Sequence, residues 1–361
     1  MAEKTEKRLG QEQDAQHSES GAESAGHAAS GTGLPYPLLR EVSRSFYLTL
    51  RVLPASIRPQ IALAYLLART TDTIADTELV PVENRLTALE ALRQRILGSR
   101  QQALDLGALA PQQASAAERQ LLNRCEEPLA ILARLSGEDQ QLVREVLDTI
   151  TSGQELDLRR FGHATAQRPA ACQTEHELDD YTYRVAGCVG EFWTRMCRLH
   201  VFPHADLDDV RLLALGVRFG KGLQLVNILR DLPEDLRRGR SYLPLENLKV
   251  LGLAPKDLLD PQNEDRARPL FEAYLELAMD HLRAGWAYTL MLPRGCVRVR
   301  LACAWPVLIG LETLDRLKAA SFLNPYSKTK VSRRRVKQIM LRSILLLPWE
   351  SRWRRMASGN R

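Results

Sequence analysis

Two pairs of aspartates, each pair four residues apart, are the groups in this sequence best suited to bind a metal ion. Asp72 and Asp76 lie in the stretch YLLARTTDTIADT, and Asp231 and Asp235 lie far downstream in LVNILRDLPEDL. On a helix, residues four apart project from the same face, so each pair would present two carboxylates together. Acidic pairs are also common on solvated helix faces, so the spacing alone does not separate a metal site from an ordinary surface.

Three features of the surrounding sequence favour a metal site. Both pairs follow strongly apolar stretches, ALAYLLA and LQLVNIL, and would lie at the ends of buried helices. An arginine precedes each pair, Arg69 in the first motif and Arg230 in the second. Mg²⁺ prefers oxygen ligands and is usually held by one or two carboxylates together with substrate phosphates. Two acidic faces across an apolar cavity could therefore hold a diphosphate through bridging Mg²⁺, while the arginines neutralise charge on the leaving group.

Most of the chain beyond residue 33 has the apolar periodicity of helices. Apolar residues recur at intervals of three and four, β-branched alternation is scarce, and Pro or Gly separates several segments. The expected helices span residues 38–51, 57–70, 83–97, 117–134, 138–151, 175–200, 207–232, 266–292 and 297–320. The sequence therefore predicts an all-α protein with a single helical bundle. Pro233 lies inside the second acidic motif, where we expect it to kink or end the helix.

Composition divides the 361 residues into three parts. Residues 1–33 are polar and rich in Gly, Ala and Ser, so we expect a disordered leader that is not a secretory signal. Residues 34–340 can bury a large core and form the expected catalytic helical domain. Residues 341–361 form a basic amphipathic tail. Six scattered cysteines without CxxC spacing indicate free thiols and a cytoplasmic protein.

The basic character of the chain is concentrated at its C-terminal end. From residue 326 onward there are eleven Lys and Arg and one acid, whereas the whole chain has a net charge of +6. The longest uncharged stretch there, SILLLPW, is far shorter than the roughly 20 residues that span a bilayer. An amphipathic helix in peripheral contact with a membrane and a last helix docked on the bundle are both consistent with this pattern. We expect no nucleic-acid partner.

With these motifs identified, the chain resembles the squalene/phytoene synthase family over residues 40–340. SRSFYLTLRVLP at 43–54 resembles the family's SxSF segment, and DTIAD at 72–76 resembles its first aspartate-rich motif. YTYRVAGCVGEFW at 181–193 resembles its YxxxVAGxVG segment, and GLQLVNILRDLPEDLRRGRSYLP at 222–244 resembles the second aspartate-rich motif. The resemblance implies an α-helical bundle around a large cavity, in which two prenyl diphosphates condense head to head through a cyclopropyl diphosphate.

The resemblance also implies roles for individual residues. The implied Mg²⁺ ligands are Asp72, Asp76, Asp231, Glu234 and Asp235. The implied substrate contacts are Ser43, Arg44, Gln224, Asn227 and Arg240. The implied catalytic residues are Tyr65, Tyr181, Tyr183, Arg69 and Arg230, with the tyrosines pointing toward the reacting centre. We interpret Gly187 and Gly190 as allowing close helix packing rather than contacting substrate.

The product depends on whether a hydride reaches the cyclopropyl intermediate. The chain has no GxGxxG dinucleotide motif, so NADPH would bind within the helical domain itself. CAWPVLIGLETL at 303–314 resembles a segment of reductive squalene synthases, and KVSRRRV at 330–336 falls where those enzymes have a basic segment associated with the nucleotide. Lys330, Arg333 and Arg334 would then contact the extra phosphate of NADPH.

We therefore expect a squalene synthase that uses farnesyl diphosphate. A dehydrosqualene or phytoene synthase without reduction is the alternative, and a non-catalytic helical scaffold is a further one. The sequence departs from eukaryotic squalene synthases at Arg184, because those enzymes place a tyrosine directly before VAG. Tyr183 instead fits the YxYxVAG form of phytoene- and dehydrosqualene-type enzymes. Which tyrosine handles the proton is left open.

Overall fold

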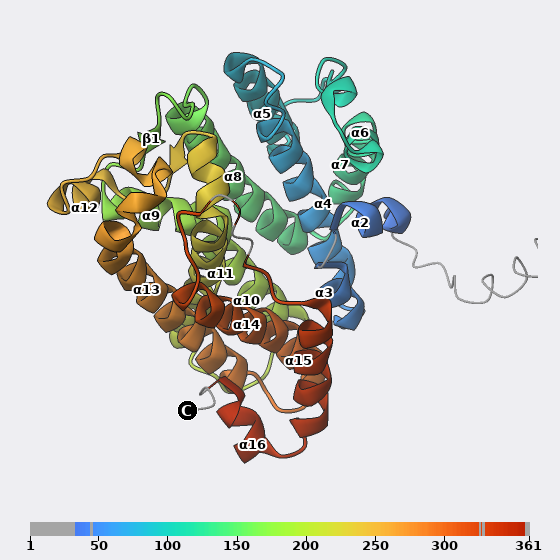
Figure 1. Ribbon diagram of the computed structural model, residues 1–361. Coiled ribbons are helices and arrows are strands. Elements are labelled where there is room, and N and C mark those ends of the chain that lie inside the picture. Colours follow the sequence, from blue (N-terminus) through green and yellow to red (C-terminus); the bar gives the residue numbers. More distant parts are fainter. Residues whose placement is uncertain (1–32, 44–45, 325, 327–328, 358–361) are drawn as a thin grey trace, which may run out of the picture. The chain divides into compact units, whose positions relative to one another are not determined.

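Helices form nearly all the regular structure in the computed structural model, which describes residues 33–357 except 44–45, 325 and 327–328 (Figure 1). The expected leader and Arg44 lie outside the described residues. From Leu34 onward the chain forms one compact unit, as the all-α prediction requires. The boundary expected between residues 340 and 341 falls inside a helix, α15 (Arg333–Leu346), so the tail is continuous with the bundle.

The helices are α2 (Tyr36–Ser43), α3 (Phe46–Val52), α4 (Arg58–Ala75), α5 (Val82–Leu97), α6 (Ala116–Asn123), α7 (Glu126–Leu132), α8 (Gly137–Phe161), α9 (Glu175–Thr182), α10 (Cys188–His200), α11 (Asp209–Arg237), α12 (Leu245–Val250), α13 (Glu264–Met291), α14 (Val297–Lys318), α15 (Arg333–Leu346) and α16 (Glu350–Arg354). A π-helical segment, Tyr183–Gly187, joins α9 to α10.

Helix α4 is longer than the sequence predicts, and this extension carries the first acidic motif. The prediction ended at residue 70, before a run of threonines that have low helix propensity. In the structure, the hydroxyls of Thr70, Thr71 and Thr73 donate to backbone carbonyls three or four residues earlier, at 2.7 to 2.9 Å. These bonds satisfy the buried hydroxyls within the helix. Helix α8 likewise continues ten residues beyond its predicted end at 151, to Phe161.

Of the two outcomes expected at Pro233, a kinked helix or an ended one, the second does not occur. Helix α11 continues through Pro233 to Arg237, and the proline itself is buried. Helix α11 packs against α10, α13 and α14, and this tertiary packing outweighs the one backbone hydrogen bond that a proline removes. By length and hydropathy α11 could also cross a membrane, but half of its apolar window is buried inside the protein.

The VAGxVG segment packs directly against the backbone of α11. A β-carbon at Gly190 would lie 1.9 Å from the carbonyl oxygen of Gly216, and one at Gly220 would lie 2.0 Å from that of Ala186. No side chain fits at such distances. Gly190 therefore acts in helix packing, as the sequence suggested, and this packing fixes α10 next to the helix that carries the second acidic motif.

A short parallel pair of strands, β1 (Ala170–Ala171) and β2 (Arg240–Ser241), positions Arg240. Ala170 is in register with Arg240, and the Ala170 amide donates to the Gly239 carbonyl at 2.8 Å. Gly239 has φ +80°, and a β-carbon there would lie 2.4 Å from the backbone of Thr165. Only glycine allows this turn, which carries the chain from the end of α11 back past the end of α8.

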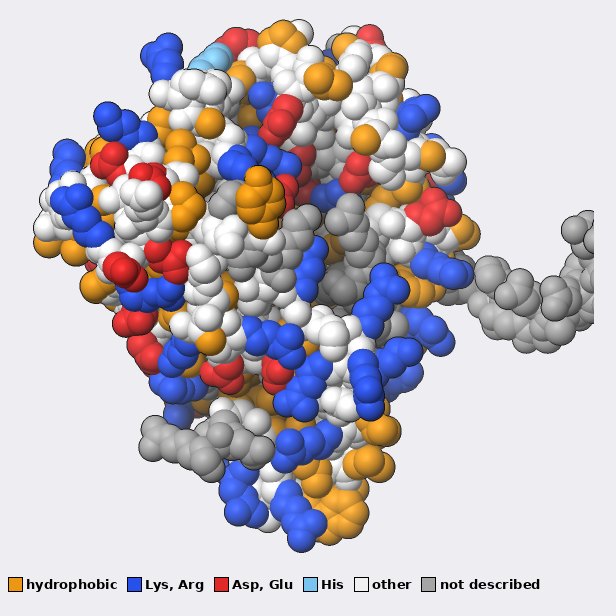
Figure 2. Space-filling view, in the orientation of Figure 1, with side chains coloured by type: hydrophobic (Ala, Val, Ile, Leu, Met, Phe, Trp, Pro, Cys, Tyr) orange, Lys and Arg blue, Asp and Glu red, His pale blue; other side chains and the backbone are white. Residues whose placement is uncertain are grey.

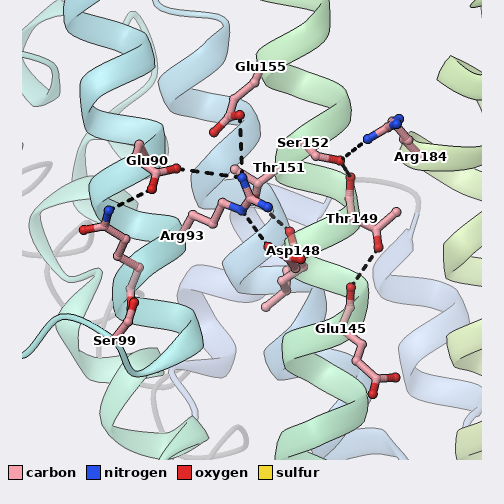
Figure 3. Close-up of polar contacts among 12 residues, drawn as sticks. Glu90, Arg93, Ser99, Glu145, Asp148, Thr149, Thr151, Ser152, Glu155 and Arg184 are labelled. Atoms are coloured by element: carbon pink, nitrogen blue, oxygen red, sulfur yellow. Dashed lines mark hydrogen bonds and ion pairs between the residues drawn. The ribbon is translucent and has the colours of Figure 1, made fainter.

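Helix α8 is held against α5 by buried leucines and one arginine. Arg93 lies 2.6 Å from Asp148 and 3.7 Å from Glu155 on α8 (Figure 3). Partly exposed ion pairs contribute only about 0.2 to 1 kcal/mol each. Most of the stabilisation comes from burial of Leu89 and Leu92 on the same face of α5.

Candidate active site

A cavity of about 450 Å³ lies between α4, α8 and the α9–α10 segment, with Gln224 of α11 and Arg240 and Tyr242 at its border. Its lining changes in character along each helix. On α4 the lining runs from Ile61 and Ala64 to the acidic Asp72 and Asp76, and on α8 it runs from Val146 and Ile150 to Asp157.

Helices α4 and α8 run parallel, so their acidic ends lie together. Gln60 near the start of α4 donates to Asp139 near the start of α8 at 3.1 Å. At the other end, the charge of Asp157 contributes to the raised pKa of Asp72. The cavity therefore has an apolar end and an acidic end.

The α9–α10 segment forms the third wall of the cavity and also has an acidic and an apolar end. Its chain runs from the acidic end to the apolar end, opposite to α4 and α8. Tyr181 lies at the acidic end, where Asp157 and Asp72 contribute to its raised pKa. Val185, Val189 and Phe192 then line the apolar part. The π-helical segment lies between these two parts and shifts the helix register, a feature frequent at functional sites.

The second acidic motif lies beside the acidic end, where the charges of Asp157 and Arg240 act on Asp235. Its predicted site residues Asn227, Arg230, Asp231 and Asp235 are not among the described residues that line the cavity. Asn227, Asp231 and Asp235 are four residues apart and share one face of α11. Burial raises the pKa of Asp235 to about 7, and the charges of Asp231 and Asp157 raise it further. Arg230 donates to Asp231 at 2.8 Å, so this arginine is held beside the motif that it precedes.

The acids of both motifs lie near the C-terminal ends of their helices. Asp72 and Asp76 lie in the last two turns of α4 or directly after it, and Asp231 and Asp235 lie in the last two turns of α11. The C-terminal end of a helix carries partial negative charge, which disfavours acids there. Burial raises the pKa of Asp76 to about 6, and the neighbouring Asp72 raises it further. Cations bound here would therefore stabilise the ionised form of these carboxylates.

The structure adds one acid that the sequence analysis missed. Asp157 lines the cavity near the end of α8, and burial raises its pKa to about 6. It accepts a hydrogen bond from the Tyr242 hydroxyl at 2.8 Å, and Tyr242 accepts one from Tyr181 at 3.3 Å. The sequence signal was weak, because the other acid in SGQELDLRR, Glu155, is two residues from Asp157 and no acid lies four residues away.

Two arginines supply positive charge at the acidic end. Arg69 lines the cavity and is held between Asp72 and Glu118 of α6, a contact that the sequence did not indicate. Arg240 lines the cavity from β2 and lies 3.3 Å from Glu78. Both guanidinium groups are mostly buried, so they are oriented by these carboxylates rather than by solvent.

Among the other predicted substrate contacts, Tyr65 and Gln224 line the cavity. The Tyr65 hydroxyl lies 3.4 Å from the Val42 carbonyl, which links α4 to α2. Ser43 is buried at the end of α2 and is not part of the cavity lining. Arg44 cannot be placed, since it lies outside the described residues.

Two predicted site residues face elsewhere. Tyr183 does not line the cavity: its hydroxyl donates to Glu191 at 3.2 Å in a separate small pocket of about 170 Å³. The expectation that it points toward the reacting centre is corrected, because residues two apart on a helix project from opposite sides and Tyr181 is the one that lines the cavity. Glu234 is exposed and pairs with Arg238 at 3.0 Å.

Arg184, which replaces the tyrosine of eukaryotic squalene synthases, also lies outside the cavity lining. It donates to Asp180 at 2.8 Å. It also donates to Ser152 of α8 at 2.9 Å (Figure 3). Its guanidinium therefore ties α9 to α8. The cavity-facing tyrosine of this segment is Tyr181.

The predicted nucleotide-binding residues are exposed on the C-terminal part of the chain. Arg333 and Arg334 border a shallow groove of about 400 Å³ along α15, together with Lys337. Lys330 precedes the helix, and its backbone carbonyl accepts a hydrogen bond from Arg316 at 3.2 Å.

Sequence comparison assigns the chain to a protein family. Residues 39–335 match the family described as squalene/phytoene synthase. The chain belongs to the squalene/phytoene synthase family. The structure shows the helical fold of this family. The cavity, which the first acidic motif lines, and the second acidic motif beside it both lie within the matched residues.

The chain is similar to several members with different activities. It is 29% identical over 246 residues to a bifunctional lycopene cyclase/phytoene synthase of Gibberella fujikuroi, which covers 67% of this chain and 40% of that protein. It is 29% identical over 310 residues to a presqualene diphosphate synthase of Sinorhizobium fredii, covering 84% and 94%. The chain spans less than two thirds of the length of the first three curated relatives, between 38% and 53% of each. A solved complex of TcSQS with the ligand BPH1237 has the same fold, with a TM-score of 0.69, 23% identity and coverage of 88% and 89%.

We expect this member of the squalene/phytoene synthase family to lose stability, in the presence of a chelator, as the pH rises from about 5 to about 8. Burial raises the pKa of Asp76 and Asp157 to about 6 and that of Asp235 to about 7, all above their value in an unfolded chain. At pH values between the pKa of each carboxyl in the unfolded chain and its higher pKa in the folded protein, the folded protein binds more protons than the unfolded chain. The free energy of unfolding therefore falls with rising pH. The loss should be on the order of 1 to 3 kcal/mol after solvent screening.

Thermal unfolding with EDTA at a series of pH values measures this dependence. The Asp157→Asn variant is the control, because it should show a shallower dependence than the parent protein. A midpoint that rises with pH across this window would contradict the assignment of buried, protonated carboxylates.

Proposed function

We propose that this protein is a squalene synthase. It condenses two farnesyl diphosphates head to head through presqualene diphosphate and reduces that intermediate to squalene with NADPH. The observation that carries the proposal is a single cavity with acids and arginines at one end and hydrocarbon side chains at the other. This polarity fits a substrate with a diphosphate head and a long apolar chain.

The acidic end suits a diphosphate held jointly with Mg²⁺. In the described part of the chain, no three His, Cys, Asp or Glu side chains form a complete metal site by themselves. Mg²⁺ usually takes one or two carboxylates and completes its shell with water and substrate phosphate, so the donors Asp72, Asp76, Asp231 and Asp235 fit it. When bound there, Mg²⁺ would neutralise the negative charge that develops on the departing diphosphate.

The protein's own residues would orient the substrate and exclude water. Arg69 and Arg240 would contact diphosphate oxygens, because guanidinium groups match phosphate geometry. Val189, Phe192 and Trp193 would surround the prenyl chain and shield the allylic cation from water. Aromatic faces also attract a positive charge.

The reductive step is supported by the C-terminal segment. The basic groove bordered by Arg333 and Arg334 would contact the extra phosphate of NADPH, with Lys330 beside it, and NADPH would supply the hydride. The alternative, a dehydrosqualene or phytoene synthase, is favoured by Arg184 in place of a tyrosine and by the phytoene synthases among the relatives.

Product analysis with and without NADPH tests the proposal. Purified protein is incubated with farnesyl diphosphate and Mg²⁺, and geranylgeranyl diphosphate is offered in parallel. We expect presqualene diphosphate without NADPH and squalene with it. An unreduced C30 hydrocarbon, or a C40 hydrocarbon, under both conditions would refute the reductive assignment.

A paired variant addresses the nucleotide contact. Arg333→Gln with Arg334→Gln should raise the KM for NADPH about tenfold and leave formation of presqualene diphosphate unchanged, since one or two charge-assisted contacts are lost. Arg134→Gln, at an exposed arginine remote from this groove in sequence, is the matched control.

A further inference from the structure

The C-terminal segment is anchored on the bundle rather than loose. Trp353 is fully buried, and its indole donates to the Ser343 carbonyl at 3.0 Å. The indole of Trp305 donates to the Ser343 hydroxyl at 2.9 Å, and that of Trp286 donates to the Arg354 carbonyl at 3.0 Å. Of the two arrangements expected for the tail, docking of a last helix on the bundle is therefore present. This docking fixes the orientation of α15 and the turn that follows it.

The opposite face of this anchored segment exposes large apolar side chains. Leu341, Ile344, Leu345 and Trp349, here called the apolar stripe, are between 46% and 59% exposed. The first three share the outward face of α15, and Trp349 extends it past the helix end. Figure 2 shows hydrophobic side chains gathered at the lower end of the molecule, over α15, among many Lys and Arg. Such a patch on a protein surface marks a site of interaction.

Positive charge predominates beside the stripe. Arg342 and Arg352 lie beside it, and neither has an acidic partner among the described residues. Two acids, Glu312 and Asp315, line the adjoining groove, and Glu312 is already paired with Arg335 at 2.9 Å and Arg316 at 3.0 Å. The one acid of the segment, Glu350, is already engaged by Arg300 at 3.2 Å and by Arg354 at 3.1 Å. The surface therefore presents apolar side chains that could enter a hydrocarbon phase. Beside them it presents guanidinium groups that could contact anions at the border of that phase.

A groove of about 1,090 Å³ continues the stripe inward. It lies between α15 and the α13–α14 pair, with Met279, Leu308 and Ile339 among its apolar lining residues. Arg342, Arg352 and other arginines also line it. A molecule with an anionic head and an acyl chain has both of the chemical characters that this groove presents.

We propose that the apolar stripe and its arginines dock the protein on the surface of a bilayer that contains anionic lipids. Leu and Ile side chains would enter the acyl boundary, Trp349 would lie at the level of the headgroups, and the arginines would contact lipid phosphates. A nucleic acid would match the charge but leave the stripe exposed to water. The stripe lies on an outward helix face and the turn after it, so it meets a plane such as a bilayer without rearrangement.

Vesicle flotation of the full-length protein tests this docking without any substrate or cofactor, so its outcome is independent of the proposed activity. Vesicles of phosphatidylcholine alone are compared with vesicles that contain about 30% phosphatidylglycerol. We expect flotation with the anionic vesicles, weak flotation with the neutral ones, and release as salt rises from about 0.05 to about 0.5 M. Glycerol phosphate in solution should not release the protein, because it supplies the anion without the apolar phase.

Variants separate the two contributions. Leu341→Ser with Leu345→Ser and Trp349→Ser should lower partitioning at least about tenfold, because three apolar side chains no longer enter the membrane. Arg342→Gln with Arg352→Gln should remove the preference for anionic lipid. Val210→Ser with Val250→Ser, at valines that are 80% and 85% exposed on other helices, is the matched control and should float like the parent protein.

Three results would overturn the proposal. The stripe variant could float as well as the parent protein while its thermal unfolding is unchanged. The control variant could lose flotation equally. The stripe variant could instead change the mass of the protein in light scattering, which would identify the stripe as an interface with a second copy of the chain.

Discussion

Asp72→Asn and Asp231→Asn are each expected to lower turnover about a thousandfold while helix content stays unchanged. Each substitution removes one charge from the group of carboxylates at the acidic end of the cavity. Loss of preorganised charge stabilisation at a leaving diphosphate is worth several kcal/mol, and about 1.4 kcal/mol corresponds to a factor of ten in rate. The fold should survive, because Asp72 and Asp231 are 42% and 43% exposed.

The comparison with Glu234→Gln makes this prediction specific to geometry. Glu234 belongs to the same motif, but it is exposed and pairs with Arg238. Its substitution should change turnover less than about threefold, as expected for a surface ion pair. Steady-state rates at saturating Mg²⁺ and circular dichroism measure both effects. Near-normal turnover in both aspartate variants would contradict the metal assignment, and an equal loss in Glu234→Gln would contradict the orientation of α11 described above.

The sequence predicted the presence of the helices better than it predicted where they end and how the residues near their ends are oriented. Apolar periodicity located the helices that form the cavity, because one face of each must be buried. It ended α4 at residue 70 and allowed α11 to end at Pro233, because the threonine hydroxyls and the packing of α11 override local propensity. The i, i+4 rule found Asp231 and Asp235 on one face. Glu234 belongs to the same motif, but its exposure and its pair with Arg238 follow from tertiary structure that spacing does not specify.

Contacts between distant segments account for what the sequence could not provide. Glu118 and Asp157 are single acids without a recognisable spacing, and only the packing of α6 and α8 brings them to Arg69 and Tyr242. The choice between Tyr181 and Tyr183, which lie on opposite sides of their helix, depended on which side packs toward the cavity. Two tyrosines two residues apart carry no signal that decides this. The docked tail likewise depends on indole hydrogen bonds to partners in other helices.

Asp157→Asn is expected to lower turnover about a hundredfold and to change the pH dependence of the rate. Formation of the cyclopropyl intermediate in the proposed reaction releases a proton from carbon, so the site needs a base. Burial raises the pKa of Asp157 to about 6, which suits a group that accepts a proton near neutral pH. Asp157 lines the cavity, and a hydrogen-bonded series of two further lining residues, Tyr181 and Tyr242, ends on its carboxylate.

The pH profile separates a base from a residue that only maintains the structure. With saturating Mg²⁺ the rate of the parent protein should rise with pH through about 6, as Asp157 ionises, and Asp157→Asn should lose this limb. Tyr242→Phe keeps the carboxylate but interrupts the series, so we expect about a tenfold loss with the limb retained. Thermal unfolding at each pH provides the control for stability. If Asp157→Asn lowers the rate equally at every pH, Asp157 positions Tyr242 and another group accepts the proton.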